Sequence, residues 1–242
     1  MMDPRPLVFL DIDDTILDFQ TAEATAIRRT FTELGIPVDD GLIARYSDIN
    51  RSQWELLEEG KLSRERVLVR RFELLFAELG LPHSGAAASA RYEQLLCEGH
   101  WFMPGAEELL RTLSRSCRLF IVSNGAKTVQ DARLRSAGIG PFFEQIFISE
   151  KLGAEKPTRN FFDRCFARIP DLALSRAVLV GDSLTSDIRG AKNAGMVSVW
   201  YNCRGYPARP DILPDYEIHE LRELPPLMAR LFPDNNFERE DA

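Results

Sequence analysis

The sequence predicts an α/β protein, with a doubly wound parallel sheet of the Rossmann-like kind and an α-helical domain inserted after the first strand. Short apolar runs rich in β-branched residues alternate with segments of helical spacing along most of the chain. This alternation is typical of strand–helix–strand units. Residues 19–99 interrupt it, because they are far longer than the roughly 2–6 residues of an ordinary strand-to-helix connection and yet are helical in pattern.

Five apolar runs have the length of strands that are buried on both faces, and each ends at polar residues. They cover residues 7–10, 119–122, 145–148, 177–180 and 197–200. A sixth run at 216–218, in the proline-rich tail that begins at Pro207, fits an edge strand. Because parallel strands present their carboxyl ends at one rim, the polar residues that follow the runs should gather there, where ligands of such sheets bind.

Helical spacing fills the gaps between the runs and recurs within the long interruption. The expected helices between the runs cover 106–113, 128–137, 161–169 and 186–194, and those of the interruption cover 24–34, 42–57, 67–79 and 87–96. Glycine ends several of them, at Gly35, Gly80, Gly138 and Gly195. We therefore expect a core domain at residues 1–18 and 100–242, and a helical cap domain at 19–99 placed above the rim.

Composition and charge narrow the classes of partner. The net charge of −7 disfavours a nucleic-acid polymer, because proteins that bind one usually carry a basic face. The first residues, MMDPRPLVFLDID, lack the pattern of a signal peptide, and no apolar stretch is long enough to cross a membrane, so we expect a cytoplasmic protein without a membrane partner. Four cysteines without a CxxC pair suit reduced thiols, and three isolated histidines argue against a zinc site.

Two pairs of carboxylates follow predicted strands. Asp11 and Asp13 come directly after the first run, and at a spacing of two on an extended chain their side chains point the same way. Asp182 and Asp187 follow the run at 177–180. Four desolvated carboxylates on one rim repel one another unless a cation lies between them, and oxygen ligands suit Mg²⁺. Each pair taken alone could instead be solvated acids at a strand end, and Asp187 could also cap the next helix.

Two further segments could hold an anion at the same rim. Ser123, Asn124 and Gly125 follow a strand run, and a hydroxyl with backbone N–H groups at a helix start can cradle a phosphate. Lys156, which precedes Pro157, can offer a point charge. Each segment alone has a plainer reading, because Ser-Asn-Gly is also a common turn and an isolated lysine is usually a surface residue.

In this order the motifs resemble those of the haloacid dehalogenase-like (HAD) hydrolase superfamily. The match consists of DxDxT at 11–15, a serine at a strand end (Ser123), Lys156-Pro157, and GDSxxxD at 181–187. It covers nearly the whole chain, since the insertion after the first strand looks like the helical cap of this superfamily. The resemblance implies a phosphatase, that is, a phosphoric monoester hydrolase, with Mg²⁺ as its cofactor.

The resemblance also implies a role for each matching residue. Asp11 would be the nucleophile and form an aspartyl-phosphate, and Asp13 would act first as acid and then as base. Mg²⁺ would be held by the carboxylate of Asp11, the main-chain carbonyl of Asp13, and Asp182. The residues close behind these ligands would be Asp187 and Ser183. The residues that would bind the phosphate group are Ser123, Asn124, Lys156 and Thr15.

A narrower resemblance concerns the substrate. The segment DIDDTILDF, with aspartate in the place where the superfamily more often has glycine, looks like the bacterial branch of pyrimidine and non-canonical 5′-nucleotidases, and so do residues 50–54, 58–61 and 98–100. The expected partner is therefore a small-molecule phosphomonoester, a nucleoside 5′-monophosphate, whose base would stack on an aromatic ring of the insertion. The candidate rings are Trp54, Phe19 and Tyr46. Each of them could instead pack the interior of the insertion.

Four other functions stay open. A sugar-phosphate phosphatase or a phosphomutase would keep all four motifs. A 2-haloacid dehalogenase would need neither Asp13 nor Mg²⁺, so the acid-rich motifs argue against it. A sensor that binds a phosphate ligand without turning it over would not need the complete set of catalytic residue types. The sequence leaves the oligomeric state open.

Overall fold

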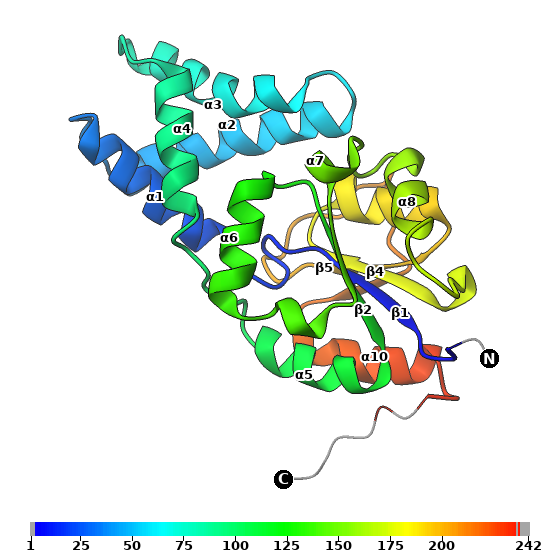
Figure 1. Cartoon of the computed structure of the whole chain (residues 1–242). Coiled ribbons are helices and arrows are strands. Elements are labelled where there is room, and N and C mark those ends of the chain that lie inside the picture. Colours follow the sequence, from blue (N-terminus) through cyan, green and yellow to red (C-terminus); the bar gives the residue numbers. More distant parts are fainter. Residues whose placement is uncertain (1–2, 236, 238–242) are drawn as a thin grey trace. The chain divides into compact units, whose positions relative to one another are not determined.

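The computed structural model describes residues 3–235 and 237, and within them it contains one six-stranded parallel sheet (Figure 1). The strands are β1 Leu7–Leu10, β2 Arg118–Ser123, β3 Gln145–Ile148, β4 Ala177–Gly181, β5 Val197–Tyr201 and β6 Tyr216–Ile218. Their order across the sheet is β3-β2-β1-β4-β5-β6, so the first strand of the chain lies in the middle. All six strands lie where the apolar runs predict them, and the α/β parallel-sheet class is confirmed.

The central strands are buried on both faces, as their continuous apolar runs require. Every residue of β1, β2 and β4 is buried. Because side chains alternate along a strand, Phe9 of β1 points to one face, where its ring stacks on Phe120 of β2 at 5.0 Å between centroids. Phe161 and Phe162 of α8 (Arg159–Phe166) pack into the same core. The sheet thus holds the carboxyl ends of β1, β2 and β4 in fixed positions.

The other α-helices outside the insertion are α5 Ala106–Ser116, α6 Lys127–Ala137, α7 Ser149–Leu152, α9 Arg189–Ala194 and α10 Leu224–Leu231. The short helices α7 and α10 were not expected, and α5 and α10 pack side by side (Figure 1). Helix α10 has prolines in its first turn, where the missing N–H has no partner to lose. Helix α8 ends at Phe166, three residues before its expected end, and the chain continues in tighter turns in which the N–H of Arg168 donates to the carbonyl of Cys165 at 3.0 Å.

The insertion forms four helices, as its periodicity predicts. They are α1 Phe19–Glu33, α2 Asp40–Glu58, α3 Arg64–Leu79 and α4 Gly85–Leu96. Side chains of Asp39, Ser63 and Ser84 cap the starts of α2, α3 and α4. The helices bury a group of aromatic rings between them, in which Tyr46 and Phe72 lie 5.0 Å apart. The expectation that Tyr46 could stack on a substrate is wrong, because its side chain is fully buried among these rings.

The chain divides into two compact units. One comprises Met1–Asp18, Phe102–Lys127 and Ala137–Ala242, and the other comprises Phe19–Trp101 and Thr128–Ser136. Most of α6 belongs to the second unit, since Arg133 donates a hydrogen bond to the carbonyl of Gly99 at 3.0 Å and its guanidinium lies 5.8 Å from the ring of Phe19. The domain limits expected from the sequence, 1–18 and 100–242 against 19–99, assign α6 to the core and stay a prediction.

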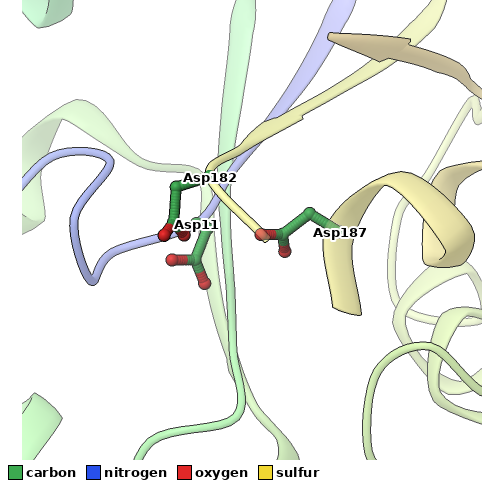
Figure 2. A group of neighbouring side chains, drawn as sticks. All are labelled: Asp11, Asp182 and Asp187. Carbon is green, nitrogen blue, oxygen red and sulfur yellow. The ribbon is translucent and has the colours of Figure 1, made fainter. Parts of the chain in front are cut away.

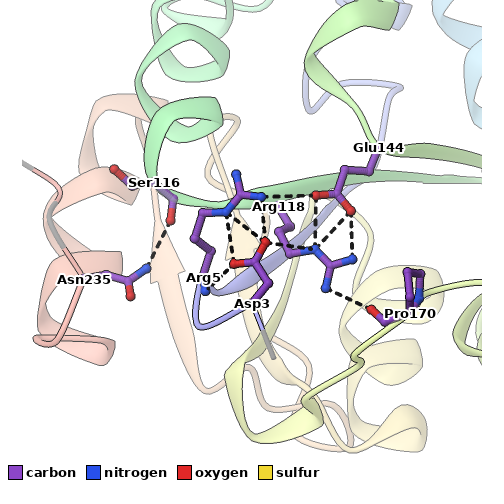
Figure 3. A network of polar contacts seen from close by, with 7 residues as sticks. All are labelled: Asp3, Arg5, Ser116, Arg118, Glu144, Pro170 and Asn235. Carbon is purple, nitrogen blue, oxygen red and sulfur yellow. Dashed lines mark hydrogen bonds and ion pairs between the residues drawn. The ribbon is translucent and has the colours of Figure 1, made fainter. Parts of the chain in front are cut away.

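The amino ends of the strands carry a cluster of ion pairs (Figure 3). Arg118, which begins β2, bonds Glu144 at 2.8 Å and the carbonyl of Pro170 at 3.1 Å, and its side chain is only 4% exposed. Arg5 pairs with Asp3 at 2.7 Å in the segment before β1. These contacts tie the chain together at the edge of the sheet opposite the rim where polar residues follow the strands.

Two further expectations can be compared with the structure. All four cysteines lie among the described residues, and all are free thiols. Within residues 3–235 and 237, no helix combines the length and the apolar character that a bilayer crossing requires.

Candidate active site

Three carboxylates meet at the carboxyl ends of β1 and β4. Asp11 follows β1, and its backbone N–H donates to the carbonyl of Val180 in β4 at 3.0 Å. Asp182 follows β4, and Asp187 lies one short turn further on. One carboxylate oxygen from each of these three residues lies within 4.8 Å of the other two (Figure 2). The parallel register therefore brings together side chains that are far apart in the sequence.

Lys156 enters the middle of this group from the loop before α8. Its Nζ donates to Oδ1 of Asp11 and to Oδ1 of Asp187, both at 2.6 Å, and to the carbonyl of Val122 at 3.0 Å. The lysine side chain is 2% exposed, so these bonds lie in a desolvated environment. All three ammonium protons have an acceptor, which fixes the lysine in one position. Lys156 is thus a component of the carboxylate group and does not lie on the surface.

The site carries more negative charge than its own cation offsets. Burial raises the pKa of Asp11 to about 8; Lys156 lowers it, and Asp187 and Asp13 raise it further. Burial, followed by the charges of Asp14 and Asp11, raises the pKa of Asp182 well above its ordinary value. Burial lowers the pKa of Lys156, but its two carboxylate partners outweigh this effect and raise it. A buried set of oxygen donors with excess negative charge fits a hard divalent cation such as Mg²⁺.

Asn124 fixes the backbone of Lys156. Its Nδ2 donates to the carbonyl of Lys156, and the backbone N–H of Lys156 donates to its Oδ1, both at 2.9 Å. This reciprocal pair joins the loop after β2 to the loop before α8. The side-chain amide of Asn124 therefore positions the lysine, and its expected contact with a phosphate group stays a prediction.

The two hydroxyl residues predicted to bind phosphate are both buried. Oγ of Ser123, the last residue of β2, accepts a hydrogen bond from the backbone N–H of Gly125 at 3.0 Å, which shapes the turn before α6. Thr15 is fully buried, and its hydroxyl has no hydrogen-bond partner among the described residues. A buried hydroxyl in that state favours a ligand or a water molecule at the loop.

Residues 12–17 form a compact turn after the nucleophile candidate. The backbone N–H of Leu17 donates to the carbonyl of Ile12, and that of Asp14 donates to the carbonyl of Leu17, both at 2.8 Å. Asp13 lies in this turn and is half-buried, outside the close group of three carboxylates. Its charge nevertheless contributes to the raised pKa of Asp11.

The segment after β4 places Asp182 and Asp187. Leu184–Ile188 is a π-helical turn that leads into α9, and its side-chain cap is Ser183, not Asp187. Ser183 also donates its backbone N–H to Oδ2 of Asp187 at 3.1 Å. A side chain on Gly181 would overlap the Asp187 carboxylate, so that residue must be glycine for Asp187 to reach Lys156.

Two residues near the site were not predicted from the sequence. Trp200 of β5 donates its Nε1 to the main-chain carbonyl of Asp182 at 2.8 Å. Arg204, in the loop after β5, pairs with Asp14 at 3.0 Å. Their positions in the sequence could have indicated them, because both lie at or just after the end of β5, the strand that pairs with β4.

The two candidates for substrate specificity belong to the second compact unit. Trp54 of α2 donates its Nε1 to Oδ1 of Asn50 at 3.1 Å, and the guanidinium of Arg64 lies 5.8 Å from its ring. Phe19 begins α1 and lies beneath the guanidinium of Arg133. Trp54 is only partly buried, so part of its ring remains accessible within its own unit. The roles of both rings stay predictions.

Comparisons with known proteins agree with this architecture. A model of the haloacid dehalogenase-like hydrolase family matches residues 6–195. Over 220 residues the chain is 43% identical to the HAD-hydrolase YfnB of Bacillus subtilis, covering 91% of this chain and 93% of that protein. A crystal structure of YfnB bound to magnesium matches with a TM-score of 0.89 and 41% identity, over 93% of this chain and 98% of the other.

Two further relatives are named for their activities. The pyrimidine 5′-nucleotidase PynA of Streptococcus pneumoniae is 32% identical, over 90% of this chain and 92% of that protein. The glyceraldehyde 3-phosphate phosphatase of Methanopyrus kandleri is 30% identical, over 94% of this chain and 98% of that protein. These likenesses extend over both compact units.

Proposed function

The chain belongs to the haloacid dehalogenase-like hydrolase family, and on this premise we propose that it is a Mg²⁺-dependent phosphatase that acts through an aspartyl-phosphate on Asp11. The observation that carries the proposal is the buried group of Asp11, Asp182 and Asp187 around Lys156. A carboxylate held by a fixed ammonium, beside acids that suit a divalent cation, is well placed to attack an anionic ester.

The proposed reaction has two steps. In the first, the Asp11 oxygen not bonded to Lys156 attacks phosphorus, a new O–P bond forms, and the ester O–P bond breaks as Asp13 gives its proton to the leaving oxygen. In the second, Asp13 takes a proton from water, whose oxygen attacks phosphorus and releases phosphate from Asp11. Asp11 and Asp13 are thereby restored to their initial states.

Binding of Mg²⁺ is assigned to the carboxylates of Asp11 and Asp182 and the main-chain carbonyl of Asp13. The bound ion would reduce the repulsion between the nucleophile and the phosphate and stabilise charge in the transition state. Asp187 keeps Lys156 in place, and Ser183 keeps Asp187 in place through its backbone N–H. Loss of Asp187 would release the lysine, and loss of the Ser183 contact would release Asp187.

The phosphate group is proposed to lie against Lys156, Ser123, Thr15 and the backbone around Asn124. Ser123 and Thr15 offer hydroxyl groups, and Lys156 offers the positive charge. Asn124 contributes by fixing the backbone of the lysine on both sides of its peptide. Each of these groups is buried and belongs to the folded core of the site, so little reorganisation should accompany binding.

The proposed substrate is a nucleoside 5′-monophosphate, with a pyrimidine or modified base. The likeness to PynA, which is named a pyrimidine 5′-nucleotidase, supports this choice. The likeness to a glyceraldehyde 3-phosphate phosphatase supports a small sugar phosphate as the alternative. A phosphomutase would need the same acids. A 2-haloacid dehalogenase is disfavoured because it has no use for the additional acids Asp13 and Asp182.

A panel of phosphomonoesters tests the proposal. Nucleotides, sugar phosphates, a short acyl phosphate and p-nitrophenyl phosphate would be assayed with Mg²⁺, with Asp11→Asn as the variant expected to be folded and inactive. Substantial turnover by a clean Asp11→Asn preparation would contradict the nucleophile. A sugar phosphate that exceeds every nucleotide in kcat/KM by a wide margin would replace the nucleotidase assignment but leave the phosphatase.

A further inference from the structure

Asp14 adopts a backbone conformation that side chains disfavour. Its φ is +55°, in the left-handed region where glycine pays no steric penalty and other residues do. Aspartate tolerates this region better than most residues, but a side chain here is still less favourable than none. The turn would close equally well with glycine, because its hydrogen bonds run between backbone atoms of Ile12, Asp14 and Leu17. The carboxylate of Asp14 therefore calls for a reason of its own.

Arg204 supplies a partner for that carboxylate from another part of the sheet. Its Nη2 lies 3.0 Å from Oδ1 of Asp14 and 3.6 Å from Oδ1 of Asp18. These two acids stand near the tip and at the end of the turn after β1, so one guanidinium spans the turn. Asp14 is the more enclosed partner of the pair, with a side-chain exposure of 14% against 30% for Arg204. Removing one partner of such a pair leaves a partly buried charge without compensation, which costs more than breaking a fully solvated surface pair.

The backbone of the turn links this ion pair to the proposed catalytic acid. If the guanidinium were removed, the carboxylate of Asp14 would lose this partner, and the unfavourable positive φ of Asp14 would be free to relax. Asp13 precedes Asp14 directly, so its side chain would move with the turn.

We propose that Arg204 is a positioning residue for the hydrolysis, and that through Asp14 it fixes the turn that carries Asp13. This inference rests on the proposed function, because Asp13 is the residue that gives a proton to the leaving oxygen. A plainer reading is that the pair only stabilises the fold. The two interpretations predict different hydrolysis rates for esters with poor and good leaving groups. Misplacing the acid slows the release of a poor leaving group far more than that of p-nitrophenolate.

The test compares an alkyl phosphate with p-nitrophenyl phosphate in Arg204→Met, Asp14→Asn and the double variant, with Mg²⁺ saturating. Asparagine keeps the size of Asp14 and tolerates a positive φ. We expect each single variant to lose roughly 10-fold or more in kcat on the alkyl ester, within the 10²–10⁴-fold that a positioned acid supplies, and less than about 3-fold on p-nitrophenyl phosphate. The double variant should be no worse than Arg204→Met, since both changes break one link.

Two further variants keep the test decisive. Arg204→Lys retains the charge and should recover most of the alkyl-ester activity. Arg209→Met removes an ion pair with Asp211 (3.1 Å) on the same loop, where the arginine side chain is 42% exposed. This variant should leave kcat unchanged on both substrates. If Arg204→Met does not fold, Asp14→Asn and Arg204→Lys carry the comparison. Equal losses on both substrates, unchanged activity, or additive effects in the double variant would overturn the positioning role.

Failure of the inference and failure of the proposed function give different results. A wild-type protein that hydrolyses neither ester with Mg²⁺ contradicts the proposed function, whatever the variants do. A wild-type protein that hydrolyses both, with variants that show no preference between leaving groups, contradicts the role of Arg204 alone.

Discussion

The ammonium group of Lys156 is shared between two carboxylates with different tasks. Its bond to Asp11 leaves the second oxygen of the proposed nucleophile for attack, and its bond to Asp187 anchors the lysine from behind. Because the group is buried, neither carboxylate can exchange this partner for water, and losing the lysine would leave a costly concentration of like charge. One residue thus balances charge and orients the nucleophile.

Substitution of Asp13 should separate acid catalysis from nucleophilic attack. We expect Asp13→Asn to lose roughly 10²–10⁴-fold in kcat on an alkyl phosphate, because the leaving oxygen then departs without a proton. The loss on p-nitrophenyl phosphate should be much smaller. Asp163→Asn, at an exposed ion pair of α8, is the matched control and should leave both rates unchanged. Identical losses on the two esters would contradict the acid role.

Gly181 provides a second test at the level of a single residue. In Gly181→Ala the new methyl group overlaps the Asp187 carboxylate, so Asp187 must shift away from Lys156. We expect a drop in kcat/KM on the order of 10²-fold, the scale of a misplacement of about 1 Å in an active site. Gly140→Ala, where no atom lies within 4 Å of the added carbon, should behave as the wild type. Full activity of Gly181→Ala would show that catalysis does not depend on the observed position of the Asp187 carboxylate.

At the scale of elements, apolar runs predicted the central strands β1, β2 and β4 because these strands are buried on both faces and cannot alternate. The shorter run of β6 was predicted from its place in the proline-rich tail, and its middle residue is exposed, as suits an edge strand. The helices were less predictable at their ends. Helix α10 was missed because two adjacent prolines suggest a loop, although they are acceptable in a first turn. Residues 186–194 were expected to form one regular helix, but 186–188 belong to the π-helical turn Leu184–Ile188 and α9 begins at Arg189, since periodicity does not distinguish one extra residue in a turn.

Variants of Trp54, in the insertion, test whether the substrate is a nucleotide. Trp54→Ala should raise KM for a nucleoside 5′-monophosphate roughly 5-fold or more, because base stacking contributes about 1–3 kcal/mol, and should leave p-nitrophenyl phosphate nearly unchanged. Trp54→Phe keeps an aromatic face but loses the bond to Asn50, and should retain most of the affinity. Parallel losses on both substrates in Trp54→Ala would mean that the ring is structural.

For the whole molecule, the excess negative charge at the rim should make both activity and stability depend on a divalent cation. EDTA should abolish hydrolysis and Mg²⁺ should restore it, whereas Ca²⁺ should inhibit because its looser coordination misplaces the nucleophile. Hydrolysis that persists in EDTA would contradict the metal site and favour the dehalogenase reading. Asp182→Asn should weaken the effect of Mg²⁺ on both properties.

The effect of Mg²⁺ on stability should also depend on pH. Burial raises the pKa of Asp11 to about 8, so the folded state holds this proton more tightly than the unfolded state does. The stability that protonation provides is lost as pH rises through that value. Mg²⁺ competes with the proton for Asp11. The increase in the Tm of the protein on adding Mg²⁺ should therefore be larger at pH 8 than at pH 6. Equal shifts at both pH values would contradict this linkage.

The acids of the site were predictable from the sequence because they follow strands whose carboxyl ends share one rim. The supporting contacts were not. Trp200 contacts Asp182 and Arg204 contacts Asp14 from β5 and the loop after it, and these contacts depend on the pairing of β4 with β5, which sequence spacing does not encode. Asn124 was predicted for the phosphate, but its side-chain amide bonds Lys156, because two loops distant in sequence close on each other.

The central position of β1 has a consequence for the way the chain acquires its structure. As the chain emerges from a ribosome, Leu7 is synthesised early. Strand β1 can pair on its two sides only after Arg118 of β2 and Ala177 of β4 have been synthesised. The helices α2, α3 and α4 pack on near neighbours in sequence, and contacts of that kind form sooner. In pulse-labelling hydrogen exchange during refolding, amides of α2–α4 should gain protection before that of Asp11, which bonds Val180. The reverse order would mean that the sheet nucleates first, and that the nucleophile is in place before the second unit has folded.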